Sequence, residues 1–233
     1  MPEGRHVQQM FSAIAGRYDV LNHVLSGGAD FWWWWRMARI SGAAPGKRFL
    51  DVAAGTGDSS LALARRGAEV VSTDFTHAML RLGPAKFARK GLAERIWASS
   101  DADAQCLPFR DASFDGVTIC YGIRNVEQRN RAYAEFLRVL RPGGRLTILE
   151  FSAPVLPGLK AVYDWYSLRV LPRVGAWISG DASAYTYLPE SIRGFPDQPT
   201  LATELEAAGF RGVRWTNLTG GIVALHIGEK GSG

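Results

Sequence analysis

The chain has 233 residues, of which 47% are hydrophobic and 21% charged, a composition that excludes a disordered protein and suits one large domain. Its net charge of +5 comes from scattered lysines and arginines, so the sequence predicts no nucleic-acid-binding surface. Two cysteines exclude a disulfide scaffold and a four-thiolate zinc site, and they favour a reducing, cytoplasmic setting. We expect neither a membrane-spanning segment nor a signal peptide, because no apolar run is long enough.

Residues 1–44 are expected to form a helical N-terminal cap in two segments. Within it, Trp32, Trp33, Trp34 and Trp35 are consecutive. Successive residues of a helix are rotated by about 100°, so these rings cannot all face one core. We expect some of them to be exposed, where large amphipathic rings favour a membrane interface. The alternatives are a homodimer contact or a large aromatic core.

Strand-like and helix-like segments alternate from residue 48 onward. Strands joined by crossover helices imply a parallel sheet covered by helices on both faces, and we assign residues 45–152 to this core. The expected strands are 48–53, 69–75, 95–100, 114–121 and 145–151, and the expected helices are 59–66, 76–90 and 127–140.

The end of the chain breaks this alternation. After a helix at 200–208, two strands at 213–218 and 222–227 are separated only by Thr219-Gly220-Gly221, which is hairpin spacing. Residues 200–233 are therefore expected to complete the core sheet with an antiparallel hairpin. The predicted fold is α/β, with a mostly parallel, seven-stranded, Rossmann-like sheet typical of class I methyltransferases that use S-adenosylmethionine (SAM).

Residues 153–199 form a long excursion between the fifth strand and the following helix. Such a long insertion in a compact domain is usually a lid or a binding element. Its aromatic side chains suit a flat, apolar ligand, and the alternative is that they only pack the lid onto the sheet. They are Tyr163, Trp165, Tyr166, Trp177, Tyr185, Tyr187 and Phe195.

A glycine-rich loop, Asp51-Val52-Ala53-Ala54-Gly55-Thr56-Gly57-Asp58, follows the first strand. Its glycines let the backbone approach a ligand closely. The spacing is neither G-x-G-x-x-G nor a P-loop, which disfavours a nicotinamide dehydrogenase. An acidic residue before a small-residue loop is similar to the first motif of SAM methyltransferases, whose ligand carries an ammonium group. We therefore place Asp51, Gly55, Thr56 and Gly57 in a SAM site.

Two further acidic positions support this site. Asp74 ends the second strand, where a carboxylate can accept both ribose hydroxyls, although capping of the next helix is the alternative. Asp103-Ala104 follows the third strand, where Asp103 is expected to meet the adenine amine unless it is a plain loop aspartate.

Motifs along nearly the whole chain, about residues 8 to 230, resemble the ubiquinone/menaquinone biosynthesis C-methyltransferase family. Several of these motifs lie in the lid and are not shared by methyltransferases in general. The motifs are Phe11–Asn22 with Leu25–Gly28, Tyr121–Val126, Glu150–Pro154, Tyr185–Ile192, Phe195–Gln198 and Asn217–His226.

The resemblance implies that SAM methylates a ring carbon of a prenylated quinol. The substrate would be demethylmenaquinol, in the last step of menaquinone biosynthesis, or a methoxy-benzoquinol of the ubiquinone branch. It also implies that Cys120 contacts the cofactor, at a position where relatives often carry serine. A thiol is a weaker donor than a hydroxyl, so Cys120 is a departure from the family pattern.

The chemistry of this reaction suggests roles for polar residues. A quinol carbon becomes nucleophilic when the adjacent hydroxyl, with a pKa of about 10, ionises. Arg124 follows the fourth strand and is expected to hold the phenolate, unless it pairs with a lid carboxylate such as Asp164 or Asp181. Asn125 would fix a hydroxyl or a water. An imidazole titrates in the range of a general base, which makes His226 a candidate; the alternative is that its place near the end of the last strand points it away from the site.

The candidate substrate contacts are Tyr121, Tyr185 and Tyr187. Methyl transfer needs no metal, and positioning carries most of the catalysis.

Two competing functions stay open at this point. One is a methyltransferase acting on another small aromatic at O or N. The other is a nonenzymatic peripheral membrane protein, which the intact glycine loop and Asp74 disfavour. The Trp32–Trp35 segment would rest on the inner face of the membrane, where the prenyl tail of the quinol resides.

Overall fold

The structure is a computed structural model that describes residues 4–170 and 183–232. Its centre is a seven-stranded sheet in the order β3-β2-β1-β4-β5-β7-β6, in which β7 is antiparallel to both of its neighbours. The other pairings are parallel, so the predicted fold is confirmed. The strands are β1 (Arg48–Val52), β2 (Glu69–Asp74), β3 (Ile96–Asp101), β4 (Phe114–Cys120), β5 (Leu140–Phe151), β6 (Arg211–Leu218) and β7 (Val223–Glu229).

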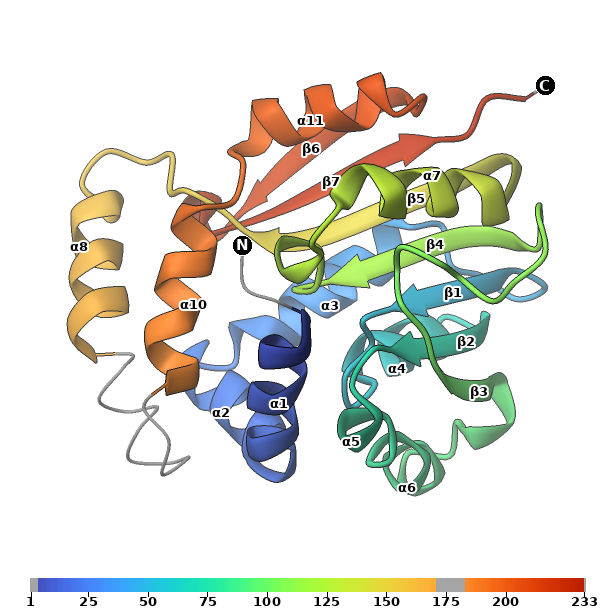
Figure 1. The fold of residues 1–233 in the computed structure, drawn as a ribbon, viewed down its shortest axis with the longest axis horizontal. Helices are drawn as coiled ribbons and strands as arrows, with labels where there is room; N and C mark the ends of the chain where they lie inside the picture. Colours follow the sequence, from blue (N-terminus) through green and yellow to red (C-terminus); the bar gives the residue numbers. More distant parts are fainter. Residues whose placement is uncertain (1–3, 171–182, 233) are drawn as a thin grey trace.

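Helices cover both faces of the sheet (Figure 1). α3 (Ala29–Ile40), α4 (Asp58–Ala64) and α6 (Gly83–Arg89) contribute to one apolar core. α7 (Arg129–Val139) and α11 (Gln198–Ala207) contribute to the other. Adjacent strand residues enter opposite cores, Phe49 the first and Leu50 the second. Because both faces are buried, the central strands read as continuous apolar runs.

Three predicted elements differ from the observed ones. The N-terminal region, expected as two helical segments, forms three helices, α1 (Gly4–Ile14), α2 (Tyr18–Leu25) and α3, because a 3-10 turn at Ala15–Arg17 and the positive φ angles of Gly27 and Gly28 interrupt it. The expected helix 76–90 is divided into α5 (His77–Leu80) and α6, because Pro84 stands in the first turn of α6 and lacks the N–H that a continuous helix needs. β5 begins at Leu140, and its pairing with β4 shifts register across the turn-like Arg141–Gly144 segment.

A helical layer lies at the carboxyl ends of the parallel strands (Figure 1). It consists of α1 (Gly4–Ile14), α2 (Tyr18–Leu25), α8 (Leu159–Trp165) with the π-helical turn Tyr166–Val170, and α10 (Ser183–Arg193). Met10, Ile14 and Leu21 form a small third core there, against which lid residues pack. The Tyr166 hydroxyl donates to the Leu25 carbonyl at 2.7 Å, which ties the lid to α2.

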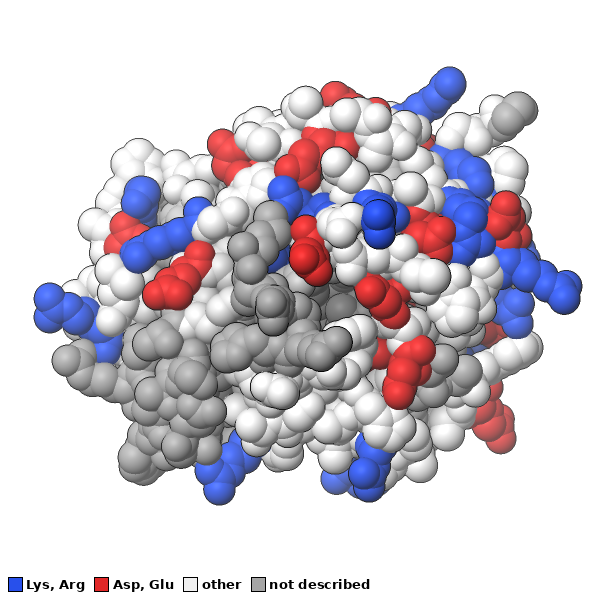
Figure 2. Space-filling view, viewed as in Figure 1, with Lys and Arg blue, Asp and Glu red and all other residues white. Residues whose placement is uncertain are grey.

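Charged side chains of both signs are interspersed over the face shown in Figure 2, without one large basic patch. Oppositely charged side chains of the protein form ion pairs, including Arg129–Glu204 and Arg138–Glu135. On this face, the positive net charge is therefore distributed as the sequence predicts. Among the described helices, none is both long and apolar enough to cross a bilayer.

Candidate functional site

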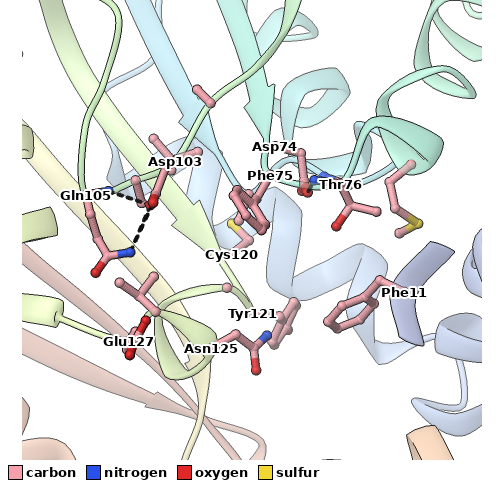
Figure 3. Close-up of a pocket in the computed structure, with 18 of the residues that line it drawn as sticks. Phe11, Asp74, Phe75, Thr76, Asp103, Gln105, Cys120, Tyr121, Asn125 and Glu127 are labelled. Atoms are coloured by element: carbon pink, nitrogen blue, oxygen red, sulfur yellow. Dashed lines mark hydrogen bonds between the residues drawn. The ribbon is translucent and has the colours of Figure 1, made fainter. Parts of the chain in front are cut away.

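A cavity of about 600 Å³ opens beside the carboxyl ends of β1 to β4 (Figure 3). Ligands of doubly wound sheets bind at this edge, and the volume suits a nucleoside-sized ligand. Five predicted cofactor residues line this cofactor cavity: Gly55, Asp74, Asp103, Ala104 and Cys120. Asp74 and Asp103 lie on one side of it, and Tyr121 and Asn125 lie on the other.

Asp74 organises the turns around this cavity. One carboxylate oxygen, Oδ2, accepts from the Gly55 N–H at 2.8 Å, and the other, Oδ1, accepts from the Thr76 N–H at 2.7 Å. Burial raises the pKa of Asp74, while these two N–H groups oppose that rise. Each carboxylate oxygen has a second lone pair. Asp74 therefore shapes the loop before α5 and still has acceptor capacity for ribose hydroxyls.

Asp103 is held by its own loop. Its Oδ1 accepts from the backbone N–H of Gln105 at 2.9 Å and from the Gln105 side-chain amide at 3.0 Å (Figure 3). Ala104 is buried between Asp103 and Gln105 and also lines the cavity. This fixed carboxylate faces the cavity region where we expect an adenine amine.

Three predicted cofactor residues, Asp51, Thr56 and Gly57, lie beneath the cavity and do not line it. Asp51 is fully buried and accepts from the hydroxyls of Ser59, Ser60 and Thr118. Burial raises the pKa of Asp51 to about 6, and these hydroxyl bonds oppose the rise. The carboxylate thus anchors the start of α4 to β1 and β4, and the prediction of a direct SAM contact is not supported.

Thr56 and Gly57 also have structural roles beneath the loop. The Thr56 hydroxyl donates to Asp19 of α2. The ammonium group of Lys86 donates to the Thr56 hydroxyl at 3.2 Å and to the Asp19 carboxylate at 2.7 Å. Gly57 has φ +90°, and a Cβ there would lie 2.4 Å from the Phe87 ring. Sequence spacing identified the loop correctly, but it did not reveal that the Thr56 hydroxyl bonds to α2 and α6 and that the Gly57 backbone packs against Phe87 of α6.

The backbone is strained where β1 and β4 meet the cavity. Ala53 and Tyr121, the first residues after these strands, have φ values of 53° and 56°. A Cβ on Gly122 would lie 2.4 Å from that of Ala53, so only glycine allows the two turns to approach this closely. Such conformations cost about 1–3 kcal/mol each and concentrate at functional sites. Sequence reasoning missed this feature.

A second cavity of about 190 Å³ lies between the N-terminal helices and the lid. We call it the aromatic cavity, because its walls include Trp33, Trp34, Phe151, Tyr163, Tyr166 and Tyr187. Phe11, Tyr18 and Tyr121 line both cavities, which therefore adjoin at these three side chains. This arrangement can hold a flat ring next to a cofactor.

The predicted substrate residues come together around this junction. Tyr121, Tyr187 and Arg124 line the aromatic cavity, and Asn125 lines the cofactor cavity. The Tyr187 hydroxyl donates to Asn125 Oδ1 at 2.7 Å, which connects the lid to the strand-four loop. The side chain of Tyr185, as well as Trp177 and Asp181, lies outside the described residues.

Arg124 forms a buried ion pair with Glu150 of β5, with 2.7 Å between Nη1 and Oε1 and side chains only 4% and 2% exposed. Nη1 also donates to the Tyr121 carbonyl, and Nε donates to Ser191 of α10. Burial raises the pKa of Glu150, and the Arg124 charge opposes that rise.

Of the two lid carboxylates named as alternative partners of Arg124, Asp164 pairs with Lys160 and Arg193 instead. That part of the alternative is therefore wrong. Sequence reasoning missed Glu150 as the partner. The available signal was an acidic residue near the end of the strand beside β4.

His226 lines neither cavity, and its position argues against the prediction that it is a general base. It is buried on β7, donates from Nε2 to the Gln198 carbonyl at 3.0 Å and stacks on Trp215. Burial lowers the pKa of His226 to about 4. Its side chain faces α11 because alternate residues of β7 face opposite sides of the sheet.

This burial predicts a pH-dependent contribution to stability. The unfolded imidazole has a pKa of about 6.5, so between that value and the folded value of about 4 the unfolded chain binds more protons. Stability from the neutral imidazole is therefore lost as pH falls through this window. Between pH 7 and 4, we expect the unfolding free energy of the wild type to fall by about 3 kcal/mol more than that of His226→Phe. Urea titrations over this range measure the difference, and parallel curves would contradict it.

The side chains of the four consecutive tryptophans are divided between the interior and the surface, as the helix geometry predicts. Trp33 and Trp34 are buried, whereas Trp32 and Trp35 are 46% and 49% exposed. Trp33 donates from Nε1 to Thr219 Oγ1 at 2.8 Å, and Trp34 lines the aromatic cavity. The expectation that the rings do not all face one core is therefore confirmed.

The sheet order, the glycine loop, the acidic residue ending β2 and the adjoining aromatic cavity define a SAM-dependent methyltransferase. The residues present fit that cofactor. Asp74 and Asp103 offer acceptors for ribose and adenine. Gly55, which has no Cβ and a φ of +58°, lets the loop approach the cofactor closely. This chain belongs to the ubiE/COQ5 methyltransferase family, whose model matches residues 2–230.

Relatives match over nearly the full length. A demethylmenaquinone methyltransferase from Clavibacter sepedonicus is 48% identical over 230 residues, covering 97% of this chain and 91% of that protein. The ubiquinone/menaquinone biosynthesis C-methyltransferase UbiE of Teredinibacter turnerae is 46% identical over 231 residues, covering 98% and 92%.

Solved structures share the fold. The (4+2) cyclase SpnF has a TM-score of 0.75 at 20% identity, covering 100% of this chain and 98% of that one. A SAM-dependent methyltransferase from Aquifex aeolicus has a TM-score of 0.61 at 18% identity, covering 82% and 86%. At these identities the likeness concerns the fold alone.

Proposed function

We propose that this chain, a SAM-dependent C-methyltransferase of quinone biosynthesis, methylates a ring carbon of demethylmenaquinol. The observation that carries the proposal is the aromatic cavity meeting the cofactor cavity at Phe11, Tyr18 and Tyr121. A flat naphthalene ring suits walls of this kind. The names of the relatives supply the substrate class, and the family assignment disfavours both a nonenzymatic protein and methylation at O or N.

The cofactor supplies an electrophilic methyl group on a sulfonium. The task of the protein is to generate a phenolate and to hold the ring in line. Arg124 lines the aromatic cavity, and no described residue accepts a hydrogen bond from its Nη2, so this nitrogen is the candidate donor to the phenolate. Asn125, held by Tyr187, orients the same region.

Two tyrosines at the junction act as donors. Burial raises the pKa of Tyr18 and raises that of Tyr121 well above its ordinary value, so both hydroxyls keep their protons at neutral pH. The aromatic walls exclude water, which strengthens these interactions. Positioning and electrostatics together would carry the reaction.

The test is incubation of the full chain with SAM and short-tailed, chemically reduced demethylated quinols of the naphthalene and benzene types. We expect the naphthoquinol to gain one methyl group on carbon, identified by mass and by the loss of one ring proton. Methylation of the benzoquinol as well would add the ubiquinone branch. A methyl on oxygen, or no product from either quinol, would contradict the proposal.

We also propose that the protein is cytoplasmic and rests on the inner face of the membrane. Exposed apolar side chains lie on the helices whose inner residues line the aromatic cavity. They are Val20 and Val24 on α2, Phe31, Trp32 and Trp35 on α3, and Val162 and Trp165 on α8. A prenyl tail leaving the cavity between these helices would enter the lipid without crossing water.

Vesicle binding tests this surface. Trp32→Lys/Trp35→Arg should lose most of its co-sedimentation with vesicles of phosphatidylcholine and phosphatidylglycerol, because two interfacial anchors are removed. Trp34 is left unchanged because it is buried in the aromatic cavity. Trp97→Arg is the matched control, since Trp97 of edge strand β3 is 58% exposed. Equal binding by all three proteins would contradict this role of Trp32 and Trp35. A wild-type dimer in sedimentation velocity that the double variant dissociates would favour a dimer contact instead.

A further inference from the structure

The proposed C-methylation needs a group that accepts a proton, and the following inference rests on that proposed function. A guanidinium stays protonated at neutral pH, so Arg124 can stabilise a phenolate but cannot take the proton that forms it. Among the described residues that line the aromatic cavity, Asp30 is the one carboxylate. It lies in the first turn of α3 and is only 3% exposed.

A hydrogen-bonded pair connects this buried carboxylate to the outside. Asp30 Oδ2 lies 2.5 Å from His23 Nδ1, and Oδ1 accepts from the Ser26 hydroxyl at 2.9 Å. The His23 side chain is 29% exposed, so its ring reaches from the carboxylate to solvent. Stacking on Phe31, with 4.4 Å between ring centroids, holds the imidazole in place. A carboxylate oriented against an imidazole is the arrangement that general bases use in enzymes.

The same cavity contains a buried hydroxyl that needs a partner. Tyr121 Oη is inaccessible to solvent and has no hydrogen-bond partner among the described residues. It lies within electrostatic reach of Asp30, whose charge is one of the causes, after burial, that raise the pKa of Tyr121. A quinol oxygen bound between these two groups would satisfy Tyr121 and place its proton beside a carboxylate.

We propose that Asp30 accepts the proton of a quinol hydroxyl and that His23 passes it to solvent. The O–H bond breaks, the proton moves to the carboxylate, and the oxygen electrons make the adjacent ring carbon nucleophilic. The carbon–methyl bond forms as the methyl–sulfur bond breaks, and its electron pair stays on sulfur. The proton of the methylated ring carbon is then transferred to the oxygen, which restores the aromatic quinol. One proton is released per turnover.

The other ionisable groups that line the cavity are a cation and tyrosines. Burial raises the pKa of every one of these tyrosines, to about 12 for Tyr163. None of them is therefore a base near neutral pH, and Asp30 has no competitor among the described lining residues. These groups are Arg124, Tyr18, Tyr121, Tyr163, Tyr166 and Tyr187.

The test compares Asp30→Asn, which keeps the shape of the side chain, with His23→Gln and the wild type. Asp30→Asn should lower kcat by about 10²-fold or more, while the KM for a short-tailed naphthoquinol and the Kd for SAM change little. His23→Gln should lower kcat by about tenfold or more, because only the exit for the proton is removed. The matched control is His77→Gln, which removes an exposed histidine paired with Asp101 outside both cavities.

A pH profile distinguishes proton acceptance by Asp30 from a purely structural role in which Asp30 holds α2 against α3. The quinol hydroxyl ionises by itself near pH 10, so the deficit of Asp30→Asn should shrink by about tenfold per pH unit between pH 7 and 9. Added formate should also restore part of the turnover of Asp30→Ala. A deficit independent of pH, a loss of SAM affinity matching the loss of kcat, or wild-type turnover in Asp30→Asn would overturn the inference. Failure of the wild type to methylate either quinol would instead overturn the proposed function.

Discussion

Replacing Arg124 by alanine should lower turnover by at least about 10²-fold, the scale of losing one oxyanion-stabilising group, while the affinity for SAM stays close to that of the wild type. Arg124 lines the aromatic cavity and not the cofactor cavity, which is why we expect the two effects to separate. Steady-state kinetics with the naphthoquinol and calorimetric titration with SAM measure them. Lost SAM affinity would reassign Arg124 to the cofactor.

The buried ion pair complicates this experiment. Arg124→Ala leaves Glu150 buried without its charge partner, which costs about 3–5 kcal/mol of stability. The double variant Arg124→Gln/Glu150→Gln removes both charges, and it should recover most of the lost melting temperature without recovering turnover. If the double variant regained near-wild-type turnover, the defect of the single variant would be one of stability, and Arg124 would have no role in the reaction.

The second large effect is expected at Asp74. Asp74→Ala should abolish detectable SAM binding while the fold survives. Two charge-assisted hydrogen bonds to ribose would contribute about 1.5–3 kcal/mol each, or about 10²–10⁴-fold in affinity. The variant also leaves the N–H groups of Gly55 and Thr76 without the oxygens that order the loop. Calorimetry measures the affinity, and circular dichroism with thermal melting checks the fold.

Asp74→Asn separates the two contributions. Its amide oxygen can still accept one backbone N–H, but the amide lacks the charge and the second acceptor that ribose needs. We expect affinity between that of the wild type and that of Asp74→Ala. Near-native SAM affinity in Asp74→Ala would remove the ribose assignment and leave Asp74 as a turn-forming residue.

The sequence by itself determined the sheet and the region of the site. Apolar runs bounded by turns, helices ended by glycine and the short Thr219–Gly221 connection are local signals, and they set the directions of the strands through short-range rules. The same rules placed Asp74 and Asp103 correctly, because the carboxyl ends of parallel strands must share one edge. Helical periodicity likewise required the Trp32–Trp35 rings to divide between interior and exterior.

Only the tertiary structure decided which polar groups face a ligand and which face one another. Asp51 and Thr56 are taken up by partners beneath the loop, and Arg124 is paired with Glu150 rather than with Asp164. His226 is turned toward α11, whereas Asp30, unremarkable in the sequence, lines the aromatic cavity. These outcomes depend on side chains from distant segments competing for the same buried hydrogen bonds. That competition is settled by packing in three dimensions, and spacing along the chain does not encode it.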